Sequence, residues 1–118
     1  MSKIKDTVSI EAAKRLDTAG ITFDCEYCYD TDGKLWRTHS SNPHRISAPQ
    51  LHNILDKLPK SREIDTPECK AEEFLLYMIA SSKGYTFYYY RGEVDFFSEN
   101  PADACAELLI WVTEKDGK

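Results

Sequence analysis

The chain has 118 residues, of which 42% are hydrophobic and 30% are charged, and its formal net charge is −5 at pH 7. This length and composition are typical of one globular domain that buries its own core. The longest apolar run, 74–80, is too short to span a bilayer, and the net negative charge opposes bulk attraction to nucleic acid or anionic membranes.

The compartment decides how the four cysteines are expected to behave. No apolar segment follows the charged residues at the N-terminus, so we expect a cytoplasmic protein without a signal peptide. Thiols stay reduced in the cytoplasm. We therefore expect free thiols at Cys25, Cys28, Cys69 and Cys105.

The N-terminal third predicts a helix followed by a hairpin. Ser9 can cap a helix over 9–19. Apolar and polar residues alternate over 23–30, as in a strand with one buried face. After turn residues at 30–33, the segment 34–38 can return as the partner strand.

The middle of the chain predicts a loop, a helix and a long connection. The polar segment 39–46 contains proline and is expected to be a loop. Ser47 and Gln50 have the spacing of a capping box for a helix that Pro59 ends. The apolar stripe of that helix comprises Leu51, Ile54, Leu55 and Leu58. Residues 59–72 are charged and predict a long irregular loop.

Aromatic strands dominate the C-terminal half. Seven aromatic residues lie within 83–97, a pattern that predicts a hairpin folded about Arg91-Gly92. With the preceding apolar run, the expected strands of this meander are 73–80, 84–90 and 93–98. Asn100 and Pro101 then predict the start of a last helix, with an apolar stripe that comprises Cys105, Leu108, Leu109 and Val112.

This order of elements predicts an α+β domain. We expect a mainly antiparallel sheet of about five strands with three helices packed on one face, in the order α-β-β-α-β-β-β-α. Strands 73–80 and 84–90 are apolar or aromatic on both sides. The second face of the sheet is therefore expected either to be covered by a partner or to be notably aromatic.

Two cysteines and two histidines have a spacing close to that of a zinc finger. Cys25, Cys28, His39 and His44 include the right ligand types for a tetrahedral site. The two cysteines lie on a predicted strand, however, where residues three apart point to opposite faces, and Pro43 prevents one helix from presenting both histidines. We therefore expect neither a metal nor another cofactor.

The segment 83–90, Lys-Gly-Tyr-Thr-Phe-Tyr-Tyr-Tyr, resembles the aromatic strand motif of RNA-recognition-motif domains. The resemblance implies base stacking on Tyr85 and Phe87. No companion strand motif precedes the segment, and acidic residues within 93–99 would repel phosphate. The pattern favours a strand of β-forming aromatic residues instead.

No catalytic motif is present in the sequence. The five glycines are isolated turn residues, so the chain has neither a phosphate-binding loop nor a dinucleotide fingerprint. No Ser or Cys is tied to the histidines by the pattern of a catalytic triad. A small enzyme or ligand binder would need a closed pocket near His39, His44 and Cys28. We expect a non-enzymatic protein.

The region 33–62 is basic and contains one acid, Asp56. Its basic side chains are Lys34, Arg37, Arg45, Lys57, Lys60 and Arg62. Most charge runs are solvated faces of a domain. The alternative hypothesis is that these six residues, with Trp36, contact nucleic acid or another anion.

Three helical segments carry a resemblance that spans most of the chain. Residues 12–16 are Ala-Ala-Lys-Arg-Leu, residues 48–55 are Ala-Pro-Gln-Leu-His-Asn-Ile-Leu, and residues 100–108 are Asn-Pro-Ala-Asp-Ala-Cys-Ala-Glu-Leu. In these segments, and in the aromatic strands between them, the chain is similar to small uncharacterised bacterial proteins of phage and mobile-element type. The resemblance implies a compact α+β accessory protein in the cytoplasm and transfers no functional residues.

The leading functional hypothesis is therefore a non-enzymatic accessory protein that acts through contact with a protein partner or through self-association. Its candidate contact residues, if the sheet face is open, are Tyr85, Phe87, Tyr89 and Phe97. Nucleic-acid binding through the basic residues of 34–62 is the alternative. No membrane partner is expected.

Overall fold

The computed structural model of the chain describes residues 7–21, 23, 27–30, 32–37, 46–90 and 94–116. Within these ranges it has three helices and eight short strands, which confirms the α+β class. The elements in chain order are α1 Ile10–Thr18, β1 Tyr27–Tyr29, β2 Leu35–Arg37, β3 Ile46–Ser47, α2 Leu51–Lys57, β4 Ser61–Ile64, β5 Glu72–Leu75, β6 Tyr77–Ala80, β7 Tyr85–Tyr88, β8 Asp95–Ser98 and α3 Pro101–Asp116.

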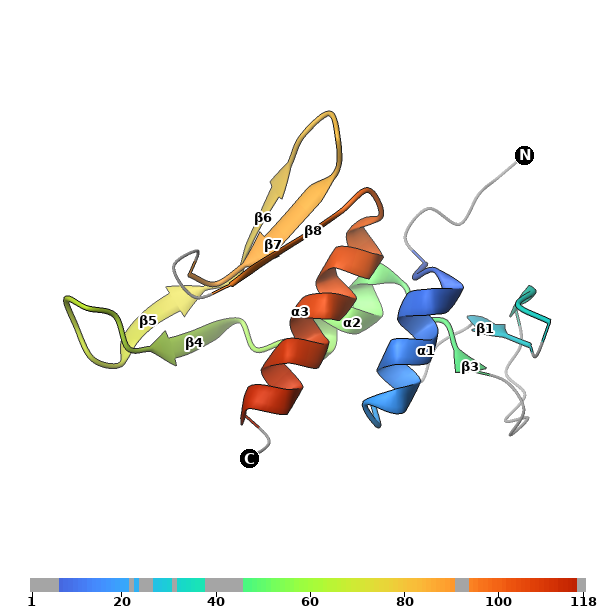
Figure 1. Cartoon of the computed structure of the whole chain (residues 1–118), viewed down its shortest axis with the longest axis horizontal. Helices are drawn as coiled ribbons and strands as arrows, with labels where there is room; N and C mark the ends of the chain where they lie inside the picture. The colour runs from blue at the N-terminus through green and yellow to red at the C-terminus, as the bar shows by residue number, and fades with distance from the viewer. Residues whose placement is uncertain are drawn as a thin grey trace.

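Helix α3 is the centre of the core. It packs against α1, α2, β7 and β8, and Figure 1 shows it between the strands β6 to β8 and helix α1. The predicted apolar stripe is confirmed, since Cys105, Leu108, Leu109 and Val112 are all buried. The alanines 102, 104 and 106 are also fully buried. These small side chains allow α3 to be surrounded closely, as expected for a helix that is apolar on most of its circumference.

The strands form three small antiparallel sheets instead of the predicted single sheet of about five strands. Their strand orders are β2-β1-β3, β4-β5 and β6-β7-β8. The helices do not share one sheet face either, because α3 packs on β7 and β8 while α1 packs on β3. The physical reason is α3, whose buried surface requires neighbours on more than one side.

The first predicted hairpin is confirmed. Strands β1 and β2 pair antiparallel, with Tyr27 opposite Arg37, although residues 24–26 of the predicted strand lie outside the described residues. The Asp30 carboxylate accepts hydrogen bonds from the main-chain amides of Asp32 and Lys34, and so closes the turn. Strand β3, which the sequence did not predict, adds to the other edge of β1.

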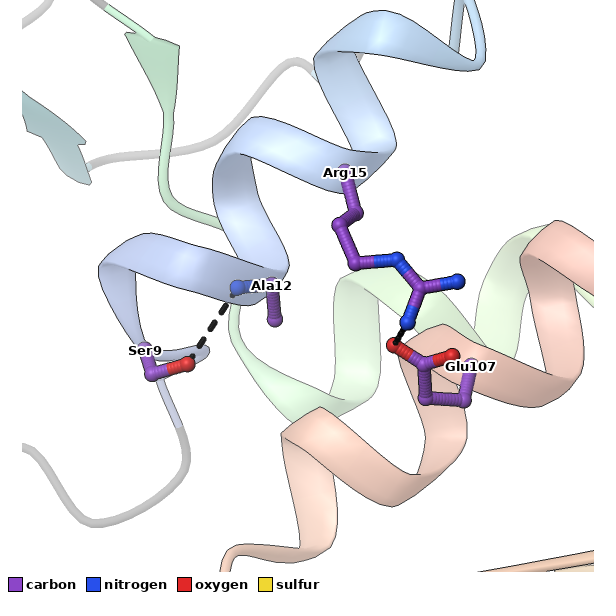
Figure 2. A network of polar contacts seen from close by, with 4 residues as sticks. All are labelled: Ser9, Ala12, Arg15 and Glu107. Atoms are coloured by element: carbon purple, nitrogen blue, oxygen red, sulfur yellow. Dashed lines mark hydrogen bonds and ion pairs between the residues drawn. The ribbon is translucent and has the colours of Figure 1, made fainter.

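Two of the three helix starts are confirmed. Ser9 caps α1, because its Oγ accepts a hydrogen bond from the amide of Ala12 at 3.3 Å (Figure 2). Asn100 caps α3, because its Oδ1 accepts from the amide of Ala102 at 2.9 Å. The predicted cap of α2 is wrong: Ser47 lies in β3, opposite Cys28.

Helix α2 begins three residues later than the predicted capping box. Its N-cap is Gln50, whose main-chain amide donates to Oδ1 of Asn53 at 2.9 Å. Ser47 cannot serve as the cap because the ladder between β1 and β3 holds its main chain in an extended conformation. The predicted loop 39–46 lies outside the described residues, apart from Ile46 in β3.

The predicted irregular loop 59–72 is wrong, because this region contains a hairpin. Strand β4 pairs with β5 in a register that sets Ser61 opposite Leu75 and Ile64 opposite Glu72. The connecting turn contains Ala71 in the left-handed region, with φ of 53°, and its amide donates to Oδ1 of Asp65 at 2.8 Å. No glycine marks this turn, so its sequence gives little warning of a hairpin.

The predicted strand 73–80 is one extended segment that serves two sheets. The amide of Leu76 donates to the carbonyl of Lys60 at 3.0 Å and continues the ladder of β4 and β5. From Tyr77 onward the segment pairs with β7. The meander β6-β7-β8 is confirmed, whereas the predicted turn at Arg91-Gly92 lies outside the described residues.

Candidate functional site

The pairing of β6, β7 and β8 decides which side chains share a face. Residues directly opposite one another point to the same face, and successive residues of a strand point to opposite faces. Phe87 belongs to the buried core, so its row, with Phe96 and Met78, lies on the side of the sheet that faces α3, although Met78 on β6 is itself 49% exposed because α3 packs on β7 and β8. The two rows that point away from α3 are Tyr77–Tyr88–Asp95 and Ile79–Thr86–Phe97.

The same face continues onto the hairpin of β4 and β5. Leu75, Tyr77 and Ile79 are two residues apart along one extended segment and therefore lie on one side of it. Opposite Leu75 lies Ser61, and opposite Glu73 lies Glu63. We call the surface formed by Leu75, Tyr77, Ile79, Thr86, Tyr88 and Phe97 the outer face.

The outer face is strongly apolar and open. Its large side chains are exposed by 56% for Leu75, 50% for Tyr77, 39% for Ile79 and 57% for Phe97. Half-exposed side chains of this size each present roughly 100 Å², so the four present roughly 400 Å². Contiguous apolar patches of this size are often functional surfaces in monomeric proteins.

The outer face is also held in a defined shape. The rings of Tyr77 and Tyr88 stack with their centroids 5.6 Å apart. Gly84 allows β8 to approach the β6–β7 turn closely, because a Cβ atom there would lie 2.6 Å from the carbonyl oxygen of Ser98. Beside Phe97, an open depression of ≈ 650 Å³ is lined by residues 81–85 and by Glu99. A partner would therefore meet a surface with fixed rings and a hollow next to one of them.

Acidic side chains border the outer face. Glu63 and Glu73 lie directly opposite one another at its β4–β5 end, and Ser61 Oγ donates to Oε2 of Glu73 at 2.9 Å. Asp95 lies in the same row as Tyr77, and Glu99 follows β8. All four carboxylates are exposed. Among the described residues, the exposed lysines of these strands and their turns are Lys60 before β4, Lys70 in the β4–β5 turn and Lys83 in the β6–β7 turn.

The four predicted contact residues differ in how far they are exposed. Phe97 is exposed, and Tyr85 is half-buried in the row that points to α3. Phe87 and Tyr89 are only 2% exposed and belong to the core, where the Tyr89 hydroxyl donates to the carbonyl of Pro59. The chain itself therefore covers Phe87 and Tyr89, whereas Phe97 is open to a partner.

Of the six residues of the outer face, sequence reasoning named only Phe97 as a contact. Leu75, Tyr77 and Ile79 were placed in a strand that is apolar on both sides, but they were not named as contacts. Their period-two spacing was the available signal. The alternation alone does not show which of the two apolar sides a helix covers.

Among the described basic residues of the middle segment, Lys34 and Arg62 lie in different parts of the molecule. Lys34 lies over the exposed ring of Trp36 at 4.9 Å in the first hairpin, and Lys57 lies over the ring of Phe23 at 5.3 Å. Arg62 on β4 lies over the ring of Trp111 at 5.2 Å. In Figure 1 β1 and β4 lie on opposite sides of α3. A single basic surface that includes both Lys34 and Arg62 is therefore not formed.

The remaining basic residues of the middle segment are Lys60, Arg45 and Arg37. Lys60 is exposed next to the start of β4. Arg45 and the side chain of Arg37 lie outside the described part of the chain.

The possible zinc ligands lie mostly outside the described residues. This is the case for Cys25, His39 and His44, whereas Cys28 is buried in β1. Among the residues that the structure does describe, no group of three or more His, Cys, Asp or Glu side chains could hold a metal ion.

The described cysteines are free thiols in different surroundings. Cys28 and Cys105 are buried, and Cys69 is exposed in the turn between β4 and β5. Burial raises the pKa of the Cys105 thiol to about 12. The Tyr29 hydroxyl donates to the carbonyl of Val8 at 2.6 Å, and its pKa is raised by burial, with smaller contributions from the charges of Asp103 and Glu11.

Comparisons of the chain with protein-family models, with curated proteins and with solved structures find no match. No helix in the described ranges combines the length and apolar character needed to cross a membrane.

Proposed function

We propose that this chain is a non-enzymatic binding protein that acts through protein contact, and that the outer face is its binding surface. The observation that carries the proposal is the gathering of four large, half-exposed apolar side chains on the outer face, where the side of the β6-β7-β8 sheet continues onto β5. Protein interfaces are built around buried aromatic and aliphatic anchors of this kind. Phe97 and Tyr77 are the expected anchors, since they are aromatic and at least half exposed.

The apolar area of the outer face supports an interface of moderate strength. Removing roughly 400 Å² of apolar surface from water is favourable by roughly 10 kcal/mol. Association costs an estimated 4–15 kcal/mol in lost translational and rotational freedom, an amount of about the same size. The apolar side chains can therefore provide contact, but selective binding requires additional groups at the border of the face.

A protein is a better occupant of this face than a nucleic acid. Surfaces that stack bases without sequence preference combine aromatic rings with a positively charged groove. Here the rings are bordered by Glu63, Glu73, Asp95 and Glu99, which would repel phosphate. The accessory role of phage or mobile-element type rests on the sequence resemblance and is part of the same proposal.

Site-specific photo-crosslinking tests the proposal. A photoreactive phenylalanine analogue is placed at position 97, and in a matched chain at position 55, because Leu55 is also apolar and exposed but lies on α2. In cells of the natural source, we expect a discrete protein adduct from position 97 and none from position 55. Adding Leu75→Ser to the first chain should reduce the adduct several-fold, since it removes part of the same face.

Two results would contradict the proposal. Equal adducts from positions 97 and 55 would show non-specific contact. Crosslinking only to nucleic acid would favour nucleic acid over protein as the partner. A fluorescence titration with single-stranded DNA at low salt checks the alternative directly, because phosphate contacts are strongest under that condition.

A further inference from the structure

We infer that the outer face binds a protein segment that carries apolar side chains together with Lys or Arg, and that the occupant is not a second copy of this chain. The inference rests on the proposed function and specifies the chemistry of the partner. It is carried by the charges around the face and by the pairing of the strands that form it.

Two carboxylates of like charge, Glu63 and Glu73, lie side by side at the acidic end of the outer face. Glu63 and Glu73 are directly opposed across β4 and β5, where Cβ atoms lie about 4.5–5.5 Å apart and like charges are destabilising. Within the described residues neither carboxylate forms an ion pair; the polar contact of Glu73 is with the Ser61 hydroxyl. An incoming Lys or Arg would relieve this repulsion and gain charge-assisted hydrogen bonds.

The positions of the acids set a length for the occupant. Glu73 and Ile79 are six residues apart on one extended segment, which corresponds to about 20 Å. A bound segment that spans this distance would place its apolar side chains over Leu75, Tyr77 and Phe97 and its cation beside Glu63 and Glu73. Asp95 and Glu99 could accept a second cation near Phe97.

Electrostatics disfavour a second copy on this face. Among the described residues, a copy would present the same four exposed carboxylates against three exposed lysines, Lys60, Lys70 and Lys83. Face-to-face packing that brings these carboxylates together would therefore oppose acid with acid. Juxtaposed like charges at an interface discriminate strongly against the wrong partner.

Strand pairing along the edge of β6 is also unfavourable for a second copy. The amide of Leu76 donates to the carbonyl of Lys60, directly before β4, and the amide of Ser81 donates to the carbonyl of Gly84 in continuation of the β6–β7 ladder. Along a strand, the main-chain groups of successive residues point to opposite edges. Leu76 is even-numbered and Ser81 is odd-numbered, so β4 and β7 lie on opposite edges of the segment. The edge of β6 that β7 leaves open is therefore the edge along which β4 lies, directly beyond the end of β6. An added strand would have only the four residues of β6 with which to pair.

A peptide-display selection on the whole chain tests the inference. Random peptides of about twelve residues are selected on the immobilised chain, and the dissociation constant of an enriched peptide is measured by fluorescence anisotropy. We expect enriched peptides to combine apolar residues with an excess of Lys and Arg over Asp and Glu. The affinity should fall as the salt concentration rises, because exposed ion pairs are screened.

Four variants assign the binding to its residues. Phe97→Ser should weaken binding more than tenfold, and the control Leu55→Ser should leave it unchanged. The double variant Glu63→Gln/Glu73→Gln should weaken binding about three- to tenfold, a range typical of a few exposed ion pairs, and should remove most of the salt dependence. Glu68→Gln, in the turn beyond β4, is the control for loss of a carboxylate away from the outer face and should have no effect.

The outcomes separate the inference from the proposed function. Peptides that depend on Phe97, lack Lys and Arg, and ignore the double variant would overturn the inference and leave the proposed function in place. A dimer in analytical ultracentrifugation that Phe97→Ser dissociates would identify a second copy as the occupant and overturn the inference. If no enriched peptide depends on Phe97, both the inference and the proposed function fail.

Discussion

At the scale of single residues, burial separates side chains that look alike in the sequence. Phe87 and Phe97 are both strand aromatics, yet one is 2% exposed and the other is 57% exposed. Cys69 and Cys105 are both free thiols, yet one is exposed in a turn and the other is enclosed by the core. Burial disfavours the thiolate of Cys105, and this gives the molecule a measurable dependence on pH.

We expect Cys105 to lower the stability of the protein at high pH. In the unfolded chain the thiol loses its proton near its ordinary pKa of 9.0, whereas the folded chain retains the proton up to about 12. Above pH 9 the unfolded state therefore binds fewer protons, so the free energy of unfolding falls as pH rises, by up to about 1.4 kcal/mol per pH unit from this group. Urea unfolding between pH 8 and 10.5 measures this slope.

Cys105→Ala provides the comparison for that measurement. The variant should be less stable than the natural chain at pH 8, by about 1 kcal/mol for the lost packing. The difference should shrink as pH rises, because the variant has no thiol to titrate. Parallel profiles for the two chains would show that Cys105 does not contribute to the pH dependence.

At the scale of secondary-structure elements, the hairpin of β4 and β5 contains an evident conflict. Its ladder opposes Glu63 and Glu73, whereas β-hairpins are usually stabilised by pairs of opposite charge. Its turn also holds Ala71 at a positive φ, a conformation that non-glycine residues rarely adopt. The hairpin is therefore less stable than its geometry allows.

We expect Glu63→Lys to stabilise the protein. The substitution replaces a like-charge pair with an opposite-charge pair and should raise the free energy of unfolding by about 0.5–1 kcal/mol at low salt. Thermal unfolding in low and high salt measures the gain, which should be smaller in high salt. Glu68→Lys changes the net charge equally without a facing carboxylate and serves as the control; an equal gain there would assign the effect to net charge.

The sequence was sufficient to predict most helices and strands, but not which of their side chains share an exposed face. Caps and apolar spacing located α1 and α3, as Ser9 and Asn100 show. The hairpin of β4 and β5 escaped prediction because its strands are partly charged and its turn has no glycine.

The composition of the outer face escaped prediction for a different reason. The alternation of side chains within each strand can be read from the sequence, but the register between neighbouring strands cannot. Phe87 pairs with Phe96, so Phe97 falls on the opposite face from Phe87, although the sequence analysis grouped Phe87 and Phe97 as contacts. The sequence did indicate that one sheet face would be apolar and aromatic. It could not select the members of that face without the register and the position of α3.

At the scale of the whole molecule, the start of α3 joins distant parts of the chain. The Asp103 carboxylate accepts a hydrogen bond from the amide of Ser9 at 2.7 Å, and Asn100 Nδ2 donates to the carbonyl of Thr7 at 2.9 Å. One turn further along, Arg15 and Glu107 form an ion pair of 2.5 Å at the surface (Figure 2). Helix α3 and its N-cap are thus connected to α1 and the residues before it by two partly buried hydrogen bonds and one exposed ion pair.

We expect the partly buried hydrogen bond of Asp103 to contribute more to stability than the exposed ion pair. Asp103→Ala should lower the free energy of unfolding by about 1.5–3 kcal/mol, since it removes a charged acceptor and leaves the amide of Ser9 without its partner. Glu107→Ala, at the exposed ion pair, should lower it by less than about 1 kcal/mol. Urea unfolding of both variants gives the comparison, and a larger loss for Glu107→Ala would contradict this ranking.

The central position of α3 also has a consequence for biosynthesis. Every other element of the domain is translated before α3, yet α1, α2, β7 and β8 all complete their packing against it. Until α3 emerges from the ribosome, the apolar sides of those elements have no common core to join. The earlier segments would then remain exposed on the nascent chain, and the domain would fold in one late step instead of element by element.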